Sequence, residues 1–206
     1  MKHHFTSGAA ALAAALVMVS GVAAQAQTAK VNDRRDDVWR ATHDEADPFV
    51  AANSPLNADI DRTTVDHGSR ELVITTTYER LAERRHTVFP IWTIRTSDGT
   101  GYSAAVLAGP GDWTGQTFLF TDSTPPPLRV SALVGAGGEC ARMSHTIDYN
   151  ANTISITIPR ACLGAPDELR VRSTAQASSG EDKSWYDNGH NRGHGQKGFT
   201  RMLGSD

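Results

Sequence analysis

The sequence has few cysteine and aromatic residues, which many recognisable catalytic and binding sites contain. Among its 206 residues there are only two cysteines, and aromatic residues make up 7%. The chain carries 20 basic and 23 acidic residues, so it has no excess of positive charge with which to hold a nucleic acid backbone. Nucleic acid is therefore excluded as an expected partner. A chain of this length buries one sizeable core, and one domain is expected.

Catalytic motifs are missing as well. The sequence has no Gly-x-Ser-x-Gly nucleophile elbow, no His-Glu-x-x-His pair and no EF-hand loop. The glycine-rich residues 135–138 lack the Lys-Ser or Lys-Thr that completes a phosphate-binding loop. Carboxylates are common, but no spacing singles out two of them as the acid and base of a glycoside hydrolase. No catalytic residue is assigned from the sequence.

Only one long apolar run occurs, and it lies at the N-terminus. Residues 9–19 follow Lys2 and precede Ala24-Gln25-Ala26, which is the pattern of a signal peptide cleaved after Ala26. The alternative, a membrane anchor, needs about 20 apolar residues, and the run is shorter. No cysteine follows the run, so a lipoprotein anchor is not indicated. We expect residues 1–26 to be a signal peptide and residues 27–206 to be secreted and extracellular, without a membrane span.

An oxidising compartment makes the two cysteines, Cys140 and Cys162, a predicted disulfide. They bracket a hairpin in which residues 143–149 and 154–158 carry apolar side chains at period two. Matching the apolar faces requires paired residue numbers that sum to 301 or 303, whereas the cysteines sum to 302. A bulge near Pro159 is therefore expected. The bridge contributes about 3 kcal/mol in the chain-entropy model; two free thiols are the alternative.

Most of the remaining chain is rich in β-branched and aromatic residues between Gly and Asp turn signals, which favours strands. Besides the hairpin, the expected strands are residues 60–66, 72–78, 88–96, 102–107, 117–121, 128–134 and 169–175. Only two short charged segments, residues 33–40 and 78–85, fit a helix. About nine strands with one disulfide hairpin predict an all-β fold, an antiparallel β-sandwich of jelly-roll-like type. Residues 178–206, poor in aliphatic side chains, are expected to pack loosely over the sandwich as a tail.

Acidic residues gather before the main run of strands, among turn-forming Pro and Asn. They are Asp33, Asp36, Asp37, Asp44, Glu45, Asp47, Asp59 and Asp61. Oxygen ligands on irregular backbone suit Ca²⁺, so the segment predicts a calcium site, with Asp59 and Asp61 as the expected ligands. The alternative is a solvated surface, partly neutralised by Arg34, Arg35 and Arg40.

The C-terminal histidines offer a second metal hypothesis. His190 and His194 are four residues apart, and Asp187 precedes them. The glycines between them indicate a loop rather than a helix, and a loop of this composition still supplies three metal ligands. A small secreted metal-dependent hydrolase is therefore kept as an alternative function, against solvated loop histidines. His145, on the apolar face of the hairpin, is expected to be a hydrogen-bonded core residue.

The leading functional hypothesis is a noncatalytic binding or surface module that is stabilised by calcium. In such a module, exposed aromatics stack on a glycan or another apolar ligand, so a glycan or a cell-surface component is the expected partner of a monomer. The expected ligand-binding residues are Trp113, Trp92 and Tyr102, with Trp185 as a further aromatic. Trp113 is preferred because it lies in a glycine-rich turn with few core neighbours. The alternative for Trp113 is a packed turn anchor.

Several short segments resemble a family of small secreted proteins that are common in actinobacteria and largely uncharacterised. The segments are Asp-Ile-Asp at 59–61, Val-Asp-His at 65–67, the strand at 71–78, Ile-Pro-Arg-Ala-Cys-Leu-Gly at 158–164 and Leu-Arg-Val-Arg at 169–172. The fold of that family resembles carbohydrate-binding modules of the family 9 and DOMON-like type, which implies a β-sandwich. The chain departs from the pattern at Ala161, where Ser is usual, and at 187–190, where an Asp-Asp-Ala-His-like ending is more familiar. The resemblance implies no site residues.

Overall fold

The computed structural model describes residues 26–41, 49–52, 57–121, 140, 142–179, 183–190 and 198–205. Three sequence predictions therefore lie outside the described residues: the signal peptide up to residue 25, the strand at 128–134 and the loop that contains His194. The acidic residues Asp44, Glu45 and Asp47 lie outside them as well. Within the described part of the chain, no helix is long and apolar enough to cross a membrane.

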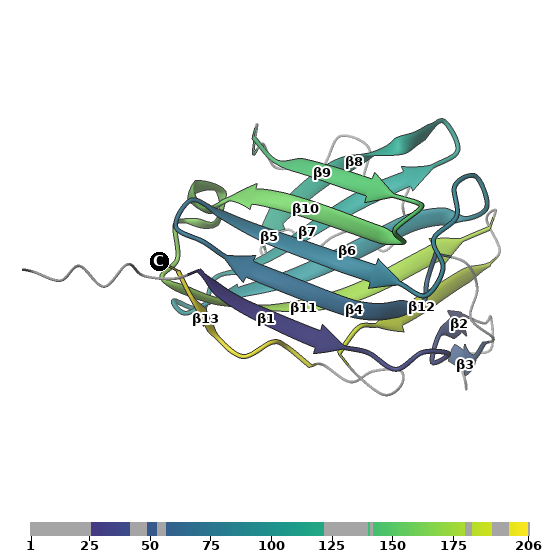
Figure 1. Ribbon diagram of the computed structural model, residues 1–206, viewed down its shortest axis with the longest axis horizontal. Coiled ribbons are helices and arrows are strands. Elements are labelled where there is room, and N and C mark those ends of the chain that lie inside the picture. The colour runs from purple at the N-terminus through teal and green to yellow at the C-terminus, as the bar shows by residue number, and fades with distance from the viewer. Residues whose placement is uncertain are drawn as a thin grey trace, which may run out of the picture.

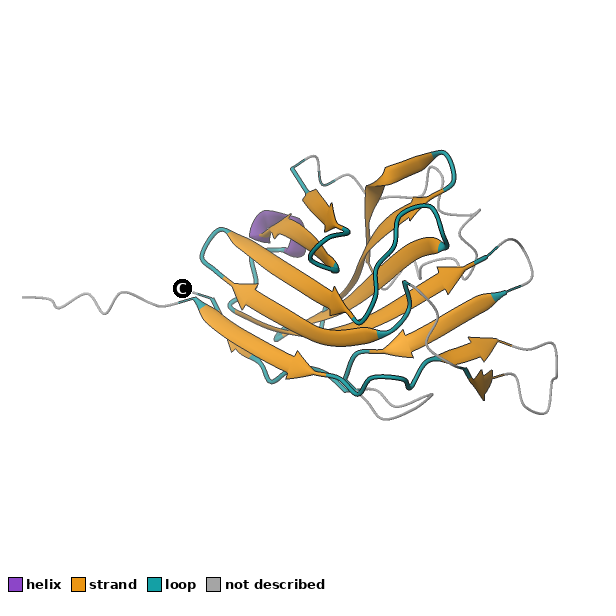
Figure 2. Cartoon of the chain, turned by 45° about the vertical axis from the view of Figure 1, so that its right-hand side comes forward, coloured by secondary structure: helices purple, strands orange, loops and turns teal. Residues whose placement is uncertain are grey.

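Two antiparallel sheets stack on each other, as Figures 1 and 2 show from two directions. Sheet A has the strand order β1-β4-β5-β10-β9, and sheet B has the order β3-β2-β12-β11-β6-β7-β8, with β13 pairing on β11. The strands of sheet A are β1 (Gln27–Asn32), β4 (Ile60–His67), β5 (Glu71–Tyr78), β9 (Ser144–Asp148) and β10 (Thr153–Pro159). Those of sheet B are β2 (Trp39–Ala41), β3 (Phe49–Ala51), β6 (Thr87–Thr96), β7 (Gly101–Gly109), β8 (Asp112–Thr121), β11 (Glu168–Ser178), β12 (Ser184–Asn188) and β13 (Leu203–Gly204). The predicted all-β antiparallel sandwich is confirmed, with thirteen strands in the described residues instead of nine.

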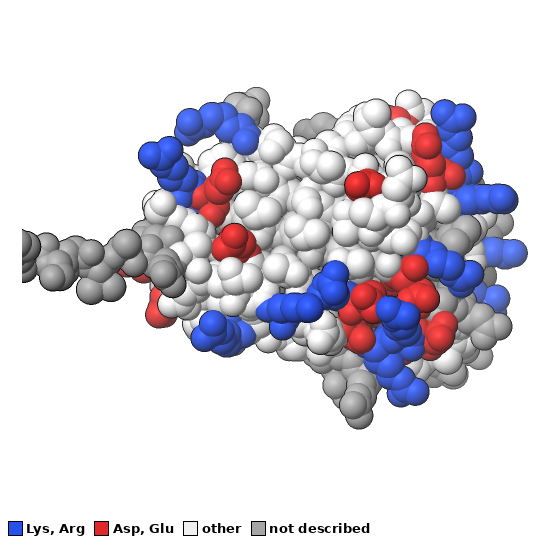
Figure 3. Space-filling view, in the orientation of Figure 1, with Lys and Arg blue, Asp and Glu red and all other residues white. Residues whose placement is uncertain are grey.

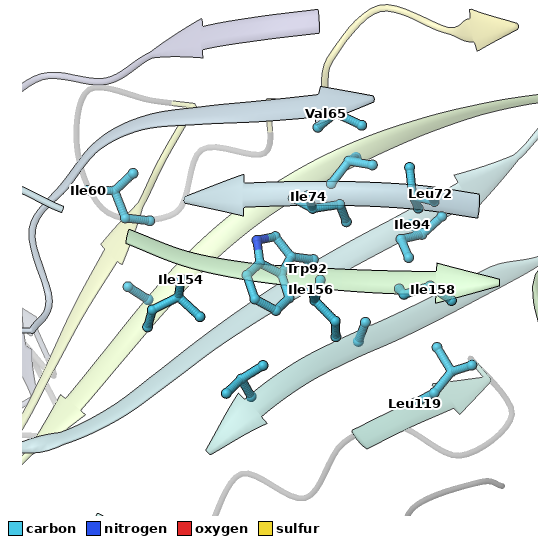
Figure 4. Close-up of a cluster of buried hydrophobic side chains, with 14 of the residues drawn as sticks. Ile60, Val65, Leu72, Ile74, Trp92, Ile94, Leu119, Ile154, Ile156 and Ile158 are labelled. Carbon is cyan, nitrogen blue, oxygen red and sulfur yellow. The ribbon is translucent and has the colours of Figure 1, made fainter. Parts of the chain in front are cut away.

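Period-two patterning explains why these segments form half-buried strands. In β10 the three isoleucines at 154, 156 and 158 are fully buried, while the residues between them are half-buried. Each such side chain contributes about 1.5–3 kcal/mol relative to an exposed one. Figure 4 shows these isoleucines around Trp92 of β6, in the layer between the sheets. The indole Nε1 of Trp92 donates to Thr76 Oγ1 of sheet A at 2.9 Å, so the core contains a polar link between the two sheets.

The disulfide between Cys140 and Cys162 is present, with a Cα–Cα distance of 5.8 Å. The hairpin pairs Ile154 with Ile147 and Thr153 with Asp148, so the paired numbers sum to 301, one of the two predicted registers. The predicted bulge near Pro159 is wrong, because Pro159 still pairs in register with Glu71. The chain instead leaves the strand in a 3₁₀ turn, η2 (Arg160–Leu163). That turn carries Cys162 out of the strand's alternation and towards its partner.

The C-terminal residues form part of sheet B. Strand β12 pairs with β11 and β13 pairs with the other end of β11. Between them, the Thr200 backbone N–H donates to Val171 O at 2.8 Å, and the Val171 N–H donates to Thr200 Oγ1 at 3.0 Å. Leu203 is fully buried. The prediction of a loosely packed tail is therefore wrong for the described residues, since one open edge of β11 supplied hydrogen bonds that composition does not reveal.

Two further sequence predictions need correction. Neither residues 33–40 nor residues 78–85 are helical: the first is a turn that leads into β2, and the second is the end of β5 followed by a loop. Strand β8 begins at Asp112 instead of Thr117, because it forms a tight hairpin with β7 through a Gly109–Asp112 pair. Trp113 therefore lies in a strand next to the turn.

Candidate metal centre

The candidate site lies at the end of the sandwich where the chain leaves β1 and later enters β4, next to β12. The Asp33 N–H donates to Asp61 O at 2.9 Å, which holds the exit of β1 against the start of β4. Asp36 has a φ of 63°, in the left-handed region. Its N–H donates to Asp59 Oδ2 at 3.0 Å. This turn brings Asp33 and Asp37 to the same place before the chain continues into sheet B.

Three carboxylates converge there. One oxygen from each of Asp33, Asp37 and Asp187 lies within 4.8 Å of the others. Calcium binds oxygen at about 2.3–2.6 Å, so two ligands on opposite sides of one ion are at most about 5 Å apart. A single Ca²⁺ therefore fits within reach of all three oxygens. Asp33 and Asp37 come from the turn after β1, whereas Asp187 comes from β12 in the other sheet.

Asp187 is the most constrained of the three. Its side chain points between the sheets and is 3% exposed. Oδ2 accepts the Ile60 N–H at 2.7 Å, and Oδ1 accepts the Asn188 N–H at 2.7 Å. Burial, followed by the charge of Asp33, raises the pKa of Asp187 to about 8, although the Ile60 hydrogen bond partly opposes the rise. Negative charge at this carboxylate is thus energetically costly unless a cation is close by.

Two buried oxygens beside Asp187 lack hydrogen-bond partners. Asp59 is 1% exposed, and its Oδ1 has no partner; its charge also contributes to the raised pKa of Asp187. The Tyr78 hydroxyl is buried without a partner, and burial raises its pKa, with a further contribution from the charge of Asp187. Buried polar atoms without partners are costly and call for an explanation. Both are hard oxygen donors of the kind that Ca²⁺ prefers.

Asp61, the other predicted metal ligand, is not part of the converging group. Arg35 Nε contacts Asp61 Oδ1 and Glu79 Oε2, each at 2.9 Å. The register between β4 and β5 shifts between Ile60 and Arg62, and this irregularity breaks the strand's alternation at Asp61. Figure 3 shows the resulting mixture of acidic and basic side chains at the end of the molecule where β2 and β3 lie.

The histidine hypothesis does not share this geometry. His190 belongs to no group of three metal-ligating side chains among the described residues. It lies beside Arg172, and burial, followed by the charge of Arg172, lowers its pKa to about 4. Among the described residues, Asp187 thus groups with the N-terminal acidic turn, and His190 is not part of that group. His145 is hydrogen-bonded as expected, with Nε2 at 2.7 Å from Thr114 O, although it is half-buried rather than in the core.

The predicted ligand-stacking aromatics are mostly occupied by packing. Trp92 is fully buried between the sheets, so its assignment as a ligand-binding residue is wrong: strand period places it on the inner face of β6. Tyr102 is half-buried and packs against the same core. Trp113 is half-buried, and its backbone oxygen accepts the Tyr149 hydroxyl at 3.1 Å. Trp185 packs against a small buried cluster and lies with its ring centroid 5.0 Å from that of His86.

Tyr78 is the residue that sequence reasoning missed at this site. It reads as the last inward residue of a strand, and nothing local marks its hydroxyl as a ligand. Comparisons of the chain with protein-family models, with curated proteins and with solved structures found no match. The site is therefore argued from its own geometry.

Proposed function

We propose that this protein is a secreted, noncatalytic binding module whose sandwich is locked at one end by a bound Ca²⁺. The observation that carries the proposal is the convergence of the Asp33, Asp37 and Asp187 carboxylates within 4.8 Å of one another. Because Asp33 follows a strand of sheet A and Asp187 belongs to sheet B, one ion joins both sheets. The cation thereby fixes the segment in which the chain passes from β1 to β2.

The donor set selects among cations. The candidate donors named above are carboxylates and a phenol, which favours a hard cation over Zn²⁺, for which Cys and His are the usual ligands. Mg²⁺ requires near-ideal octahedral geometry and keeps several waters, whereas Ca²⁺ accepts irregular sets of protein oxygens. Three carboxylates, two of them on an irregular turn, therefore fit Ca²⁺ best.

Secretion and the binding of a glycan or cell-surface component belong to the same proposal. The disulfide between Cys140 and Cys162 is compatible with an extracellular location. The resemblance to secreted carbohydrate-binding-like sandwiches points in the same direction and stays a prediction. The alternative, a hydrolase built on Asp187, His190 and His194, stays a prediction, because His194 lies outside the described residues; among the described residues, Asp187 groups with Asp33 and Asp37.

The test is thermal unfolding in about 10 mM CaCl₂ against chelator, with MgCl₂ as the control for ionic screening. An extracellular site has a dissociation constant on the order of 0.1–1 mM. At a constant of about 0.1 mM, 10 mM calcium is a hundredfold excess and adds about 2.7 kcal/mol of stability. At roughly 2–4 °C per kcal/mol, the melting temperature should rise by about 5 °C or more.

The variant Asp187→Asn sharpens this test. It should lose the calcium response, because an uncharged amide replaces one ligand carboxylate. Its stability in chelator should fall somewhat, since Asn has one acceptor oxygen for the two backbone N–H groups that Asp187 accepts. Asp61→Asn is the matched control, since Asp61 lies in the same region but pairs with Arg35; its calcium response should persist. Equal melting temperatures in calcium and chelator, a shift fully reproduced by Mg²⁺, or a response lost only in Asp61→Asn would each overturn the proposal.

A further inference from the structure

Three arginines lie together on the outer face of sheet B. Along β11, Leu169, Val171 and Ser173 are buried against the core, so the alternate residues Arg170 and Arg172 point outwards. Arg170 pairs directly with Arg95 of β6. Like charges placed opposite each other on adjacent strands are destabilising. A negative group near Arg170 and Arg172 would relieve this repulsion.

The described residues supply no such carboxylate to Arg170 or Arg172. Neither makes an ion pair within the described part of the chain, although Glu168 lies two residues before Arg170 on the same strand. Arg172 donates to the neutral Thr93 Oγ1 at 3.2 Å, and its Nε is buried without a partner. Burial lowers the pKa of Arg172, and the charge of Arg95 adds to the effect. The Arg172 guanidinium is thus partly desolvated, and no carboxylate in the described part of the chain pairs with it.

Phe199 holds the two β11 guanidinium groups in place. The ring centroid of Phe199 lies 4.8 Å from Arg170 Cζ and 5.2 Å from Arg172 Cζ. A guanidinium over an aromatic ring keeps its planar fork of N–H donors available at its edge, where it binds carboxylates in bidentate fashion. The next residue, Thr200, is tied to Val171 by two hydrogen bonds. The ring is therefore fixed to the strand that carries both arginines, which preorganises the donors.

Neutral polar groups adjoin the arginines on this face. Thr174 and Gln176 follow Arg172 at the same period, and Gln176 pairs with Tyr186 of β12. His190, beside Arg172, has a buried Nε2 without a partner. Hydroxyl, amide and imidazole groups next to charged donors suit a ligand that carries both hydroxyls and an anionic group.

We propose that the outer face of sheet B around Arg170 and Arg172 binds a carboxylate-bearing oligosaccharide, such as a chain of uronic acids. The arginines take the carboxylates, and the neighbouring polar groups on β11 and β12 take sugar hydroxyls. This goes beyond the calcium proposal, because it names the ligand class and uses a different face of the molecule. The surface is complementary in charge to such a ligand and already holds its donors in position.

The experiment is calorimetric titration of trigalacturonate into the protein in chelator, which keeps calcium from bridging the sugar. Maltotriose is the neutral saccharide of equal length, and sodium sulfate tests a simple anion. We expect trigalacturonate to bind, maltotriose to bind much more weakly, and Arg172→Gln and Arg170→Gln each to lower the affinity at least tenfold. Arg170 is exposed, so its variant should fold even where Arg172→Gln does not.

Arg62→Gln is the matched control, because Arg62 is half-buried on sheet A and donates to Thr77 Oγ1; its affinity should equal that of the native protein. The proposal is overturned by absence of trigalacturonate binding, by equal losses in Arg62→Gln and Arg170→Gln, or by sulfate binding as tightly as the saccharide. Repeating the titration with Asp187→Asn separates the two proposals. Binding that persists there depends on the arginine face alone, whatever the outcome of the calcium melts.

Discussion

The acidic end of the sandwich and the basic outer face of sheet B both gather like charges, but at different depths. Asp59 and Asp187 are 1% and 3% exposed. Arg170 is exposed by contrast, and Arg172 is half-buried. The burial of each cluster determines which ligand can neutralise it. A single metal ion can bind among buried carboxylates, whereas an oligosaccharide can contact only the outer face. The same electrostatic problem therefore leads to two ligands of opposite charge and very different size.

The two regions also differ in how the fold assembles them. Asp33 and Asp187 are 154 positions apart in the sequence, and they meet only when both sheets have formed. Arg170 and Arg95 need only the pairing of β11 with β6. Cation binding should therefore be linked to the global stability of the sandwich. Binding on the arginine face should respond to local changes and leave the calcium effect intact.

The largest expected effect comes from removing two carboxylates at the acidic end. The double variant Asp33→Asn, Asp37→Asn should lose the calcium stabilisation of about 2.7 kcal/mol expected at a hundredfold excess of ion. In chelator it should be at least as stable as the native protein, because the mutual repulsion with Asp187 is weaker. Chemical unfolding with and without calcium measures both quantities. Loss of stability in chelator with a retained calcium response would contradict the assignment.

The sequence predicted much of the fold and only part of this centre. Strand period and turn signals located β4 to β7 and the disulfide hairpin, because these segments alternate clearly. Short strands such as β2 and β13 carry too few residues to show a period, and they form only where an edge is open to them. The predicted Asp59 does lie at the acidic end. Its true neighbours, Asp187 and Tyr78, come from distant segments whose convergence no local pattern reveals.

A smaller effect is expected from substitution of Gly189, which packs against Ile60 at the acidic end. A Cβ at this position would lie 3.0 Å from Ile60 Cδ1 and Cγ2, and the Ile60 N–H donates to Asp187. Gly189→Ala should therefore cost about 2 kcal/mol through overpacking and should also weaken calcium binding. Trigalacturonate affinity should not change. Unfolding and calcium titrations measure these effects.

Gly68→Ala is the matched control for that variant. Its Cβ would meet only Glu71 O, at an ordinary distance of 3.6 Å, so both stability and calcium affinity should stay close to native values. A Gly189→Ala protein with native stability and native calcium affinity would show that Ile60 adjusts freely. The backbone around Asp187 would then be less constrained than we infer.

The neutral state of His190 gives a pH-dependent effect on the basic face. Its folded pKa of about 4 lies below the ordinary value of 6.5, so the folded protein binds this proton less readily than the unfolded chain. The resulting stability is present above pH 6.5 and is lost as the pH falls towards 4. With solvent screening, the loss should be on the order of 1 kcal/mol. His190→Gln should remove this pH-dependent part of the stability. Unfolding of both proteins at pH 7 and pH 4.5 in chelator will measure it. If the stability of both proteins changes equally with pH, the prediction is wrong.

The smallest expected effect concerns the ring under the arginines. Phe199→Leu keeps a large apolar side chain but removes the aromatic face beneath Arg170 and Arg172. Each cation–π contact is worth about 0.5–1 kcal/mol at a partly exposed site, so trigalacturonate should bind roughly two- to fivefold more weakly. The calcium-induced rise in melting temperature should be unchanged, because the acidic end involves other segments.

Measuring both ligands on the Phe199→Leu protein is therefore the finest test of the contrast between the two regions. If the saccharide affinity falls and the calcium shift persists, the two charge clusters act independently, as their separate assembly implies. If the calcium shift falls in proportion to the saccharide affinity, the two faces are coupled through β11 and β12, the strands that carry Arg172 and Asp187. The difference in burial between the two clusters would then not make calcium binding and saccharide binding independent.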